Sequence, residues 1–130
     1  MAFKLINATE AKEGTNIIVD NAPCTVRSID ISKTGKHGAS KCRIECIGII
    51  DNKKRIVAVP GHERFEVPLI EKKRAQILSV SGNMASVMDS ENFETFEIPF
   101  SEEIKEQVQE GRNAEYWIVD GIKIIKRVMQ

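Results

Sequence analysis

The residue with the clearest chemical potential is Lys36, which stands between Gly35 and Gly38 in a polar stretch, residues 32–40. The two glycines leave the backbone free to turn tightly around the lysine. A lysine presented in this way can contact a phosphate as a point charge, or it can enter the active site of another enzyme and be modified there. A third interpretation is a solvated turn lysine without a partner, and the spacing alone favours this one.

The charges around Lys36 are unevenly distributed. The whole chain is neutral, but 11 basic and 8 acidic residues precede Glu71, while 8 basic and 11 acidic residues stand from Glu71 onward. Between positions 27 and 43, one acid, Asp30, accompanies five basic residues: Arg27, Lys33, Lys36, Lys41 and Arg43. Such a local surplus indicates a tip that faces a polyanion. The charge count alone equally suits a solvated loop balanced by acids elsewhere.

Other residues with reactive side chains form no recognised motif. The three cysteines lack the paired spacing of structural zinc ligands, and we expect buried thiols in a reducing compartment: Cys24, Cys42 and Cys46. His37 and His62 lie in no motif of nucleophilic catalysis. Gly35-Lys36 lacks the glycine spacing and the following hydroxyl of a phosphate-binding loop. The sequence therefore predicts no catalytic residues, no metal site and no enzyme.

The sequence predicts that the elements that position Lys36 are short β-strands. Runs rich in β-branched and apolar residues predict strands at 16–19, 24–31, 41–50, 55–59 and 65–67, each bounded by turn residues. In the third of these, alternation puts Cys42, Ile44 and Cys46 on one face. Regular short strands without a helix are typical of a small β-barrel or sandwich. Residues 32–40 are then an exposed loop, and residues 3–13 suit either a strand or a helical turn.

The second half predicts five strands, at 75–80, 84–88, 93–98, 114–119 and 122–129, with a helix between Ser101 and Gly111. This is the order of an OB-fold. Most of its aromatic residues are expected to fill the core, which leaves no strong autonomous nucleic-acid face: Phe93, Phe96, Phe100, Tyr116 and Trp117. We expect an all-β chain of two small barrels, with domains at 1–70 and 71–130 joined around 68–74.

The chain has no apolar run of the length that a membrane helix needs, about 20 residues. Its first residues lack the apolar core of a secretion signal. We therefore expect a cytoplasmic protein without membrane contact.

The segment Ser32-Lys33-Thr34-Gly35-Lys36-His37-Gly38 resembles the modification loop of the translation initiation factor 5A family, in its archaeal branch, with distant similarity to bacterial elongation factor P. Val67-Pro68, the two-barrel layout and the length extend the resemblance over essentially the whole chain. It implies an SH3-like N-terminal barrel and a C-terminal OB-fold with one short helix. It also implies that deoxyhypusine synthase transfers an aminobutyl group from spermidine to Lys36, giving deoxyhypusine or hypusine.

The loop neighbours implied to contact the synthase or a tRNA are Lys33, Thr34, Gly35, His37, Gly38 and Lys41. The resemblance further implies a monomer without a cofactor that binds the ribosome beside peptidyl-tRNA and promotes peptide-bond formation at stalled or proline-rich sequences. Two other functions stay open from the residues. One is a general RNA-binding or RNA-chaperone module that uses the OB-fold, and the other is an RNA-cleaving enzyme that uses His37 or His62.

Overall fold

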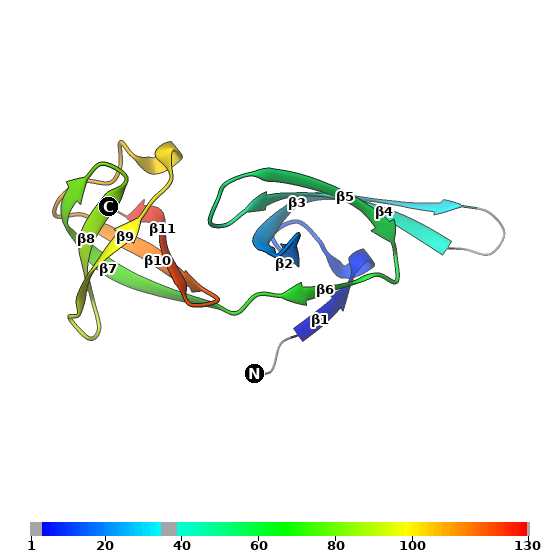
Figure 1. Cartoon of the computed structure of the whole chain (residues 1–130), viewed down its shortest axis with the longest axis horizontal. Coiled ribbons are helices and arrows are strands. Elements are labelled where there is room, and N and C mark those ends of the chain that lie inside the picture. Colours follow the sequence, from blue (N-terminus) through cyan, green and yellow to red (C-terminus); the bar gives the residue numbers. More distant parts are fainter. Residues whose placement is uncertain (1–3, 35–38, 130) are drawn as a thin grey trace. The chain divides into compact units, whose positions relative to one another are not determined.

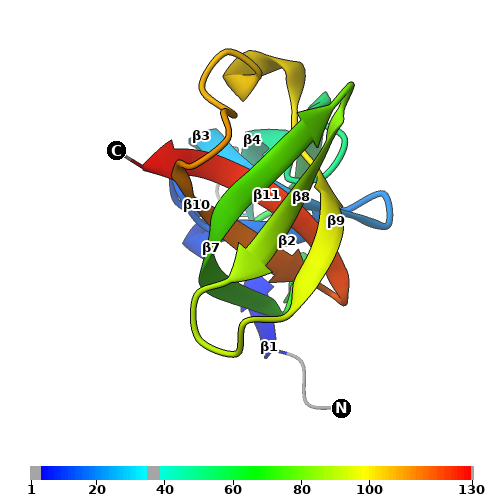
Figure 2. The same ribbon diagram turned by 90° about the vertical axis from the view of Figure 1, so that its left-hand side faces the viewer.

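The computed structural model describes residues 4–34 and 39–129, whose regular secondary structure consists almost entirely of β-strands (Figures 1 and 2). The elements, in chain order, are β1 (Lys4–Asn7), the 3₁₀ helix η1 (Ala8–Glu10), β2 (Asn16–Val19), β3 (Ala22–Thr34), β4 (Ala39–Gly48), β5 (Lys54–Pro60), β6 (Arg64–Val67), β7 (Ile70–Ser81), β8 (Met84–Asp89), β9 (Thr95–Pro99), the 3₁₀ helix η2 (Glu102–Ile104), β10 (Asn113–Val119) and β11 (Ile122–Met129). The predicted all-β class is confirmed.

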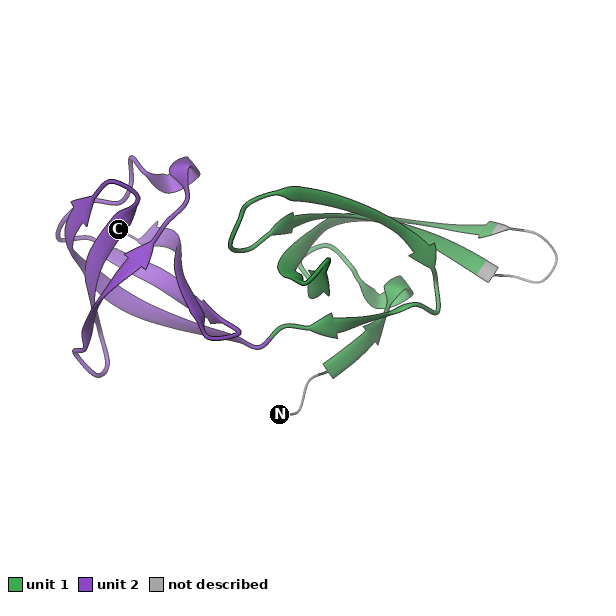
Figure 3. Cartoon of the chain, viewed as in Figure 1, with its two compact units in different colours: residues 1–68 green, residues 69–130 purple. Residues whose placement is uncertain are grey.

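The first compact unit comprises residues 1–68 (Figure 3, green). Its larger sheet has the order β2-β3-β4-β5, and a second, two-stranded sheet pairs β1 with β6. The two sheets share one core, to which β1 contributes Ile6, β4 contributes Ile44 and β6 contributes Val67. This is the small N-terminal barrel that the resemblance implied. The ambiguous segment 3–13 contains both a strand, β1, and a helical turn, η1.

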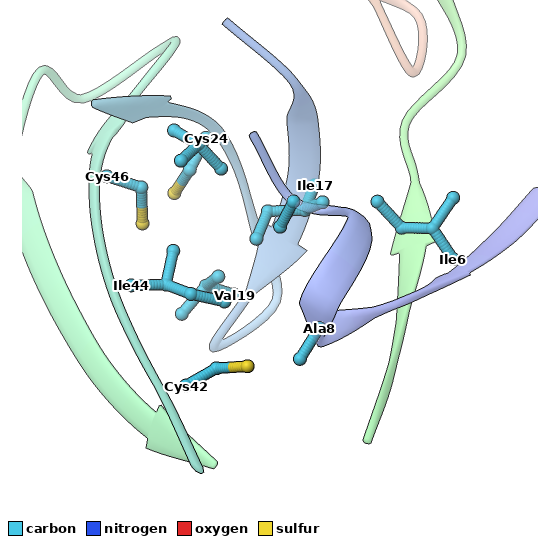
Figure 4. Close-up of a cluster of buried hydrophobic side chains, with 10 residues drawn as sticks. Ile6, Ala8, Ile17, Val19, Cys24, Cys42, Ile44 and Cys46 are labelled. Atoms are coloured by element: carbon cyan, nitrogen blue, oxygen red, sulfur yellow. The ribbon is translucent and has the colours of Figure 1, made fainter. Parts of the chain in front are cut away.

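The core of the first unit depends on the alternation along β4 (Figure 4). Cys42, Ile44 and Cys46 are fully buried, while Lys41 and Arg43 on the other face are exposed. The predicted face assignment is therefore confirmed. Because successive side chains of a strand point to opposite faces, this pattern fixes the register of β4 against the core.

The second unit comprises residues 69–130, and its sheet has the order β11-β10-β7-β8-β9. A parallel bridge between Phe100 and Ile125 joins the end of β9 to β11 and closes the barrel (Figure 2). Tight turns connect the hairpins, with positive φ at Gly82 and at Asp120-Gly121. The predicted order of three strands, a short helix and two strands is confirmed, as an OB-fold requires.

The largest differences between the predicted elements and the structure are three. The helix after Ser101 is only the 3₁₀ turn η2, and the Ser101 side chain forms no capping hydrogen bond. The segment 101–111 offers too few apolar residues, chiefly Ile104 and Val108, to stabilise a longer helix, and short helices are marginal without packing. The strand predicted at 75–80 begins earlier, at Ile70, because its charged first residues pair with β10.

The third difference concerns the polar stretch 32–40. The loop in this stretch is shorter than predicted, because β3 continues to Thr34 and β4 starts at Ala39. Hairpin pairing uses backbone hydrogen bonds, so polar side chains do not prevent it.

Among the described residues, no helix is long and apolar enough to cross a membrane.

Candidate functional site

The β3–β4 hairpin carries the segment that contains Lys36. β3 and β4 lie side by side (Figure 1), and their register runs over ten residue pairs, from Cys24 opposite Gly48 to Thr34 opposite Ala39, with an irregularity between Val26 and Ser28. The inner half of this ladder is rooted in the barrel core, where Val26 pairs with the buried Cys46. The rest of the hairpin is therefore an extension of a well-packed sheet.

The hairpin continues beyond the core of its barrel. Cys42 is buried, but its partner Ile31 is already 49% exposed. Three more pairs follow, which at strand spacing add roughly 10 Å. The last described pair is Thr34 opposite Ala39, and residues 35–38 connect the two strands in the sequence.

This connection lies outside the described residues and contains Gly35, Lys36, His37 and Gly38. The side chains of Thr34 and Ala39 also lie outside the described part of the chain. The sequence-predicted site is therefore described only through the strands that lead to it. Of the predicted contact residues, Lys33 on β3 and Lys41 on β4 are described, and both are exposed.

Cations occupy both faces of the extended hairpin. Residues directly opposite one another in an antiparallel pair share a face. Lys33 lies opposite Ser40 and Lys41 lies opposite Ser32, so the two lysines are on opposite faces. Arg43 lies opposite Asp30, the one acid of this region. The outer part of the hairpin therefore presents positive charge in two directions, which suits insertion between anionic groups.

Gly61 fixes the base of this extension, a role that the sequence reading missed. Its N–H donates to the carbonyl oxygen of Ser40 at 2.9 Å. A Cβ at Gly61 would overlap Ser40 Oγ and would lie 3.0 Å from Thr9 Cγ2. Only a glycine lets the turn after β5 approach β4 so closely. In the sequence, Pro60-Gly61 indicates only that the strand before it ends there.

The cysteines are structural. All three are free and buried, and burial raises the pKa of each thiol, that of Cys46 to about 12: Cys24, Cys42 and Cys46. Such thiols are poor nucleophiles and poor metal ligands.

His62 is exposed on the turn between β5 and β6. Within residues 4–34 and 39–129, no group of three or more His, Cys, Asp or Glu side chains gathers to hold a metal ion.

The second unit has an aromatic and basic flank that the sequence reading also missed. The Nζ atoms of Lys72 and Lys126 lie 4.7 and 5.5 Å from the ring centroid of Trp117. The indole N–H of Trp117 donates to Glu115 Oε1 at 2.8 Å. These residues come from three strands, β7, β10 and β11, so their proximity depends on strand order, which the sequence pattern alone did not supply.

The aromatic residues are less uniformly buried than predicted. Phe100 and Tyr116 are in the core, and Phe96 and Trp117 are half-buried. Phe93 is 68% exposed and lies in the turn before β9, so it is not one of the core aromatic residues, and the predicted start of this strand at residue 93 was wrong.

Comparisons with known proteins agree with this architecture. Residues 4–62 match the family model described as translation initiation factor 5A-like, N-terminal. The chain is 43% identical over 123 residues to translation initiation factor 5A of Archaeoglobus fulgidus, which covers 95% of this chain and 96% of the relative. It is 45% identical over 130 residues to translation initiation factor 5A of Caldivirga maquilingensis, covering 98% of each.

A solved structure extends the likeness to three dimensions. The structure described as eukaryotic translation initiation factor 5A from Methanococcus jannaschii matches with a TM-score of 0.86 and 35% identity, covering 98% of this chain and 95% of that one. The sequence identities hold over nearly the full length of both chains, and the same two-unit fold accompanies them. This chain belongs to the translation initiation factor 5A family.

Proposed function

We propose that this chain, a translation factor by family, binds the ribosome beside peptidyl-tRNA and promotes peptide-bond formation through a deoxyhypusine or hypusine side chain on Lys36. The observation that carries the proposal is the β3–β4 hairpin. It extends past its barrel core, bears exposed Lys33 and Lys41 on opposite faces, and leads directly into the segment that contains Lys36. The factor would act in the cytoplasm as a monomer.

The proposed modification adds an aminobutyl group from spermidine to Lys36, transferred by deoxyhypusine synthase. It roughly doubles the reach of the side chain and adds a second cationic nitrogen. Two spaced positive charges can bridge phosphates and 2′-hydroxyl groups in a narrow RNA cleft. The modified residue therefore suits the acceptor end of a tRNA better than an ordinary lysine does.

In this mechanism the chain supplies position rather than an acid, a base or a nucleophile. Holding the acceptor end of the peptidyl-tRNA in a productive pose lowers the entropic part of the barrier to peptide transfer. The benefit is greatest for substrates that reach this pose poorly. Consecutive prolines are such substrates, because the rigid ring fixes φ and restricts the reactive geometry.

Fragment mass spectrometry of the Lys36 peptide tests the modification. The protein is purified from its native host, because recombinant protein made without the synthase would carry plain lysine. We expect an aminobutyl addition on Lys36, with or without one further oxygen. A wholly unmodified Lys36 in the native protein would contradict the proposed mechanism.

Lys36→Arg tests the dependence of function on the modification. The substitution keeps the charge but offers the synthase no primary amine, so we expect peptide formation on a consecutive-proline template to fall to the rate without factor. Lys12→Arg, at an exposed position of the same unit, is the matched control and should act as the wild type. Both rates are measured with purified ribosomes in a reconstituted translation assay. Full activity of Lys36→Arg would exclude the mechanism.

A general RNA-binding module is the second candidate function, since Trp117 is flanked by Lys72 and Lys126. Bases stack on aromatic rings, and lysines contact the phosphates between them. RNA affinity that is unchanged by Lys36→Arg but reduced by Lys72→Ala would favour this alternative.

A further inference from the structure

The loop between β8 and β9 presents an aromatic side chain that the fold does not use. This loop, residues 90–94, projects from the barrel of the second unit (Figure 2). Its Phe93 is 68% exposed and has a φ of +61°. The left-handed conformation is unfavourable for a residue with a bulky side chain, and glycine or asparagine is the usual occupant. Folding alone would therefore favour another residue here.

The shape of the loop is fixed without the phenyl ring. Asp89 Oδ1 accepts hydrogen bonds from the N–H groups of Glu91 at 2.8 Å and Asn92 at 3.1 Å. The N–H of Phe93 donates to the carbonyl oxygen of Asp89 at 3.0 Å, and the N–H of Glu94 donates to Asn92 Oδ1 at 2.9 Å. Asp89 itself is buried and accepts a hydrogen bond from the Tyr116 hydroxyl. The ring is thus held in water by a preformed turn.

The charges beside the ring indicate the chemistry of its partner. Glu91 and Glu94 flank Phe93 and are both exposed. Two carboxylates repel a phosphate backbone, so a nucleic acid is an unsuitable partner for this loop. A protein surface rich in lysine and arginine is complementary to them, and a large aromatic residue that enters a socket is a frequent anchor of protein interfaces.

We propose that the β8–β9 loop docks onto a basic protein surface, with Phe93 inserted into an apolar socket and with Glu91 and Glu94 facing the cationic rim. The inference rests on the proposed function in one respect: the ribosome is where we expect this surface. The loop would then be a protein-facing contact, chemically distinct from the cationic β3–β4 hairpin.

Phe93→Gly separates a binding role from a structural one. Glycine relieves the unfavourable φ, so the midpoint of thermal unfolding should stay the same or rise. The affinity for purified ribosomes from the source organism should fall at least fivefold, and Phe93→Trp should restore most of it. Ile122→Ala, at another exposed apolar residue of the same unit, is the control and should leave the affinity unchanged. Unchanged affinity of Phe93→Gly would overturn the proposal.

The double substitution Glu91→Lys and Glu94→Lys tests the class of partner by the sign of its effect. A basic protein surface predicts weaker ribosome binding, and the loss should be greater at low salt. Stronger binding would mean that the loop faces RNA, which would overturn the proposal.

A photo-crosslinking residue at position 93 then identifies what the loop touches. We expect a crosslink that protease destroys and ribonuclease does not, and a crosslink to ribosomal RNA would contradict the proposal. If the wild-type chain binds no ribosomes, the proposed function fails and this inference fails with it. If the wild type binds and all Phe93 and glutamate variants bind equally well, only this inference fails.

Discussion

At the scale of single residues, the Asp89–Tyr116 pair is the polar centre of the second unit. Asp89 is a charged residue buried in the barrel, where it accepts hydrogen bonds from the Tyr116 hydroxyl and from two backbone N–H groups. The hydrogen bond from Tyr116 lowers the pKa of Asp89. Burial, and then the hydrogen bond to Asp89, raise the pKa of Tyr116. The pair thus stabilises the fold with the carboxylate ionised and the phenol neutral.

These two pKa shifts predict that the free energy of unfolding is constant over a middle range of pH and falls at an acid edge and at an alkaline edge of that range. Because the pKa of folded Asp89 lies below its ordinary value of 3.8, its contribution is present above that pH and is lost as the pH falls further. Because the pKa of folded Tyr116 lies above 10.0, its contribution is present below that pH and is lost as the pH rises through the folded value. Fluorescence of Trp117, the single tryptophan, should follow both edges during denaturant unfolding.

Tyr116→Phe isolates this pair. Removing the hydroxyl deletes a hydrogen bond to a charged acceptor, so we expect the free energy of unfolding to fall by about 2 kcal/mol at neutral pH. The alkaline edge that belongs to Tyr116 should disappear. An unchanged unfolding curve would show that water or a rearranged neighbour replaces the hydroxyl. Phe96→Leu, beside the same ring, controls for the loss of packing.

The three cysteines lead to a second prediction at this scale. The thiolate is the reactive form of cysteine, and burial raises the pKa of all three thiols. We expect iodoacetamide at pH 8 to leave the native chain unlabelled and to add three groups in guanidinium chloride. Intact mass spectrometry gives the count. Rapid labelling of the native chain would mean that the first barrel opens readily.

At the scale of elements, the important feature is how the β3–β4 hairpin is held at its base. The hydrogen bond from Gly61 to Ser40 ties the start of β4 to the turn after β5. Gly61 also leaves room for Thr9, which belongs to the 3₁₀ helix η1. The hairpin is therefore braced by two separate segments of the barrel before it extends beyond the core.

Gly61→Val should loosen this brace. The added side chain collides with Ser40 and Thr9, so we expect weaker pairing at the base of the hairpin and lower thermal stability of the first barrel. Amide hydrogen exchange should be faster around residues 39–42 while residues 69–130 keep their protection. Under the proposed function, the synthase should also modify Lys36 more slowly. The Cβ added by Gly82→Ala meets no atom within 4 Å but is strained by the φ of +61° at that position, so this substitution is a control whose effect should stay within the second unit. Wild-type exchange at residues 39–42 would contradict this account.

Much of the element pattern could be predicted because it depends on local signals. Alternation along β4 and the turn residues Asp20-Asn21 and Asp120-Gly121, all with positive φ, are visible in the sequence and reappear in the structure. The length of the hairpin was not visible, because polar residues 32–34 pair through backbone groups alone. The position of Gly61 against Ser40 and of Lys72 against Trp117 depends on contacts between distant segments. The proposed role of Lys36 rests on a family resemblance and stays a prediction.

At the scale of the whole molecule, residues 4–34 and 39–129 form two separate hydrophobic cores. The core around Ile17 and Ile44 draws only on residues of the first unit, and the core around Ile77 and Ile98 draws only on residues of the second. Each barrel therefore buries its own apolar side chains. Charge divides in the same way, with the basic surplus in the first half of the chain and the acidic surplus in the second.

Separate cores predict that residues 69–130 fold when produced alone. The closed sheet and the buried Asp89–Tyr116 pair lie entirely within this segment. We expect a cooperative thermal transition by circular dichroism, with modest stability because small domains bury a smaller share of their surface. Segment 1–68 should be tested in parallel. A spectrum of an unfolded chain for residues 69–130 would show that the second core needs the first unit.

The antiparallel ladder of β3 and β4 restricts how the distance between the barrel and residues 35–38 can change during evolution. One extra residue in each strand lengthens the hairpin by about 3.4 Å and turns its end to the opposite face, since strand side chains alternate with a period of two. Two extra residues in each strand restore the face but add about 7 Å. A covalent addition to a side chain in the connection escapes this restriction, so that reach can be adjusted while the facing direction stays the same.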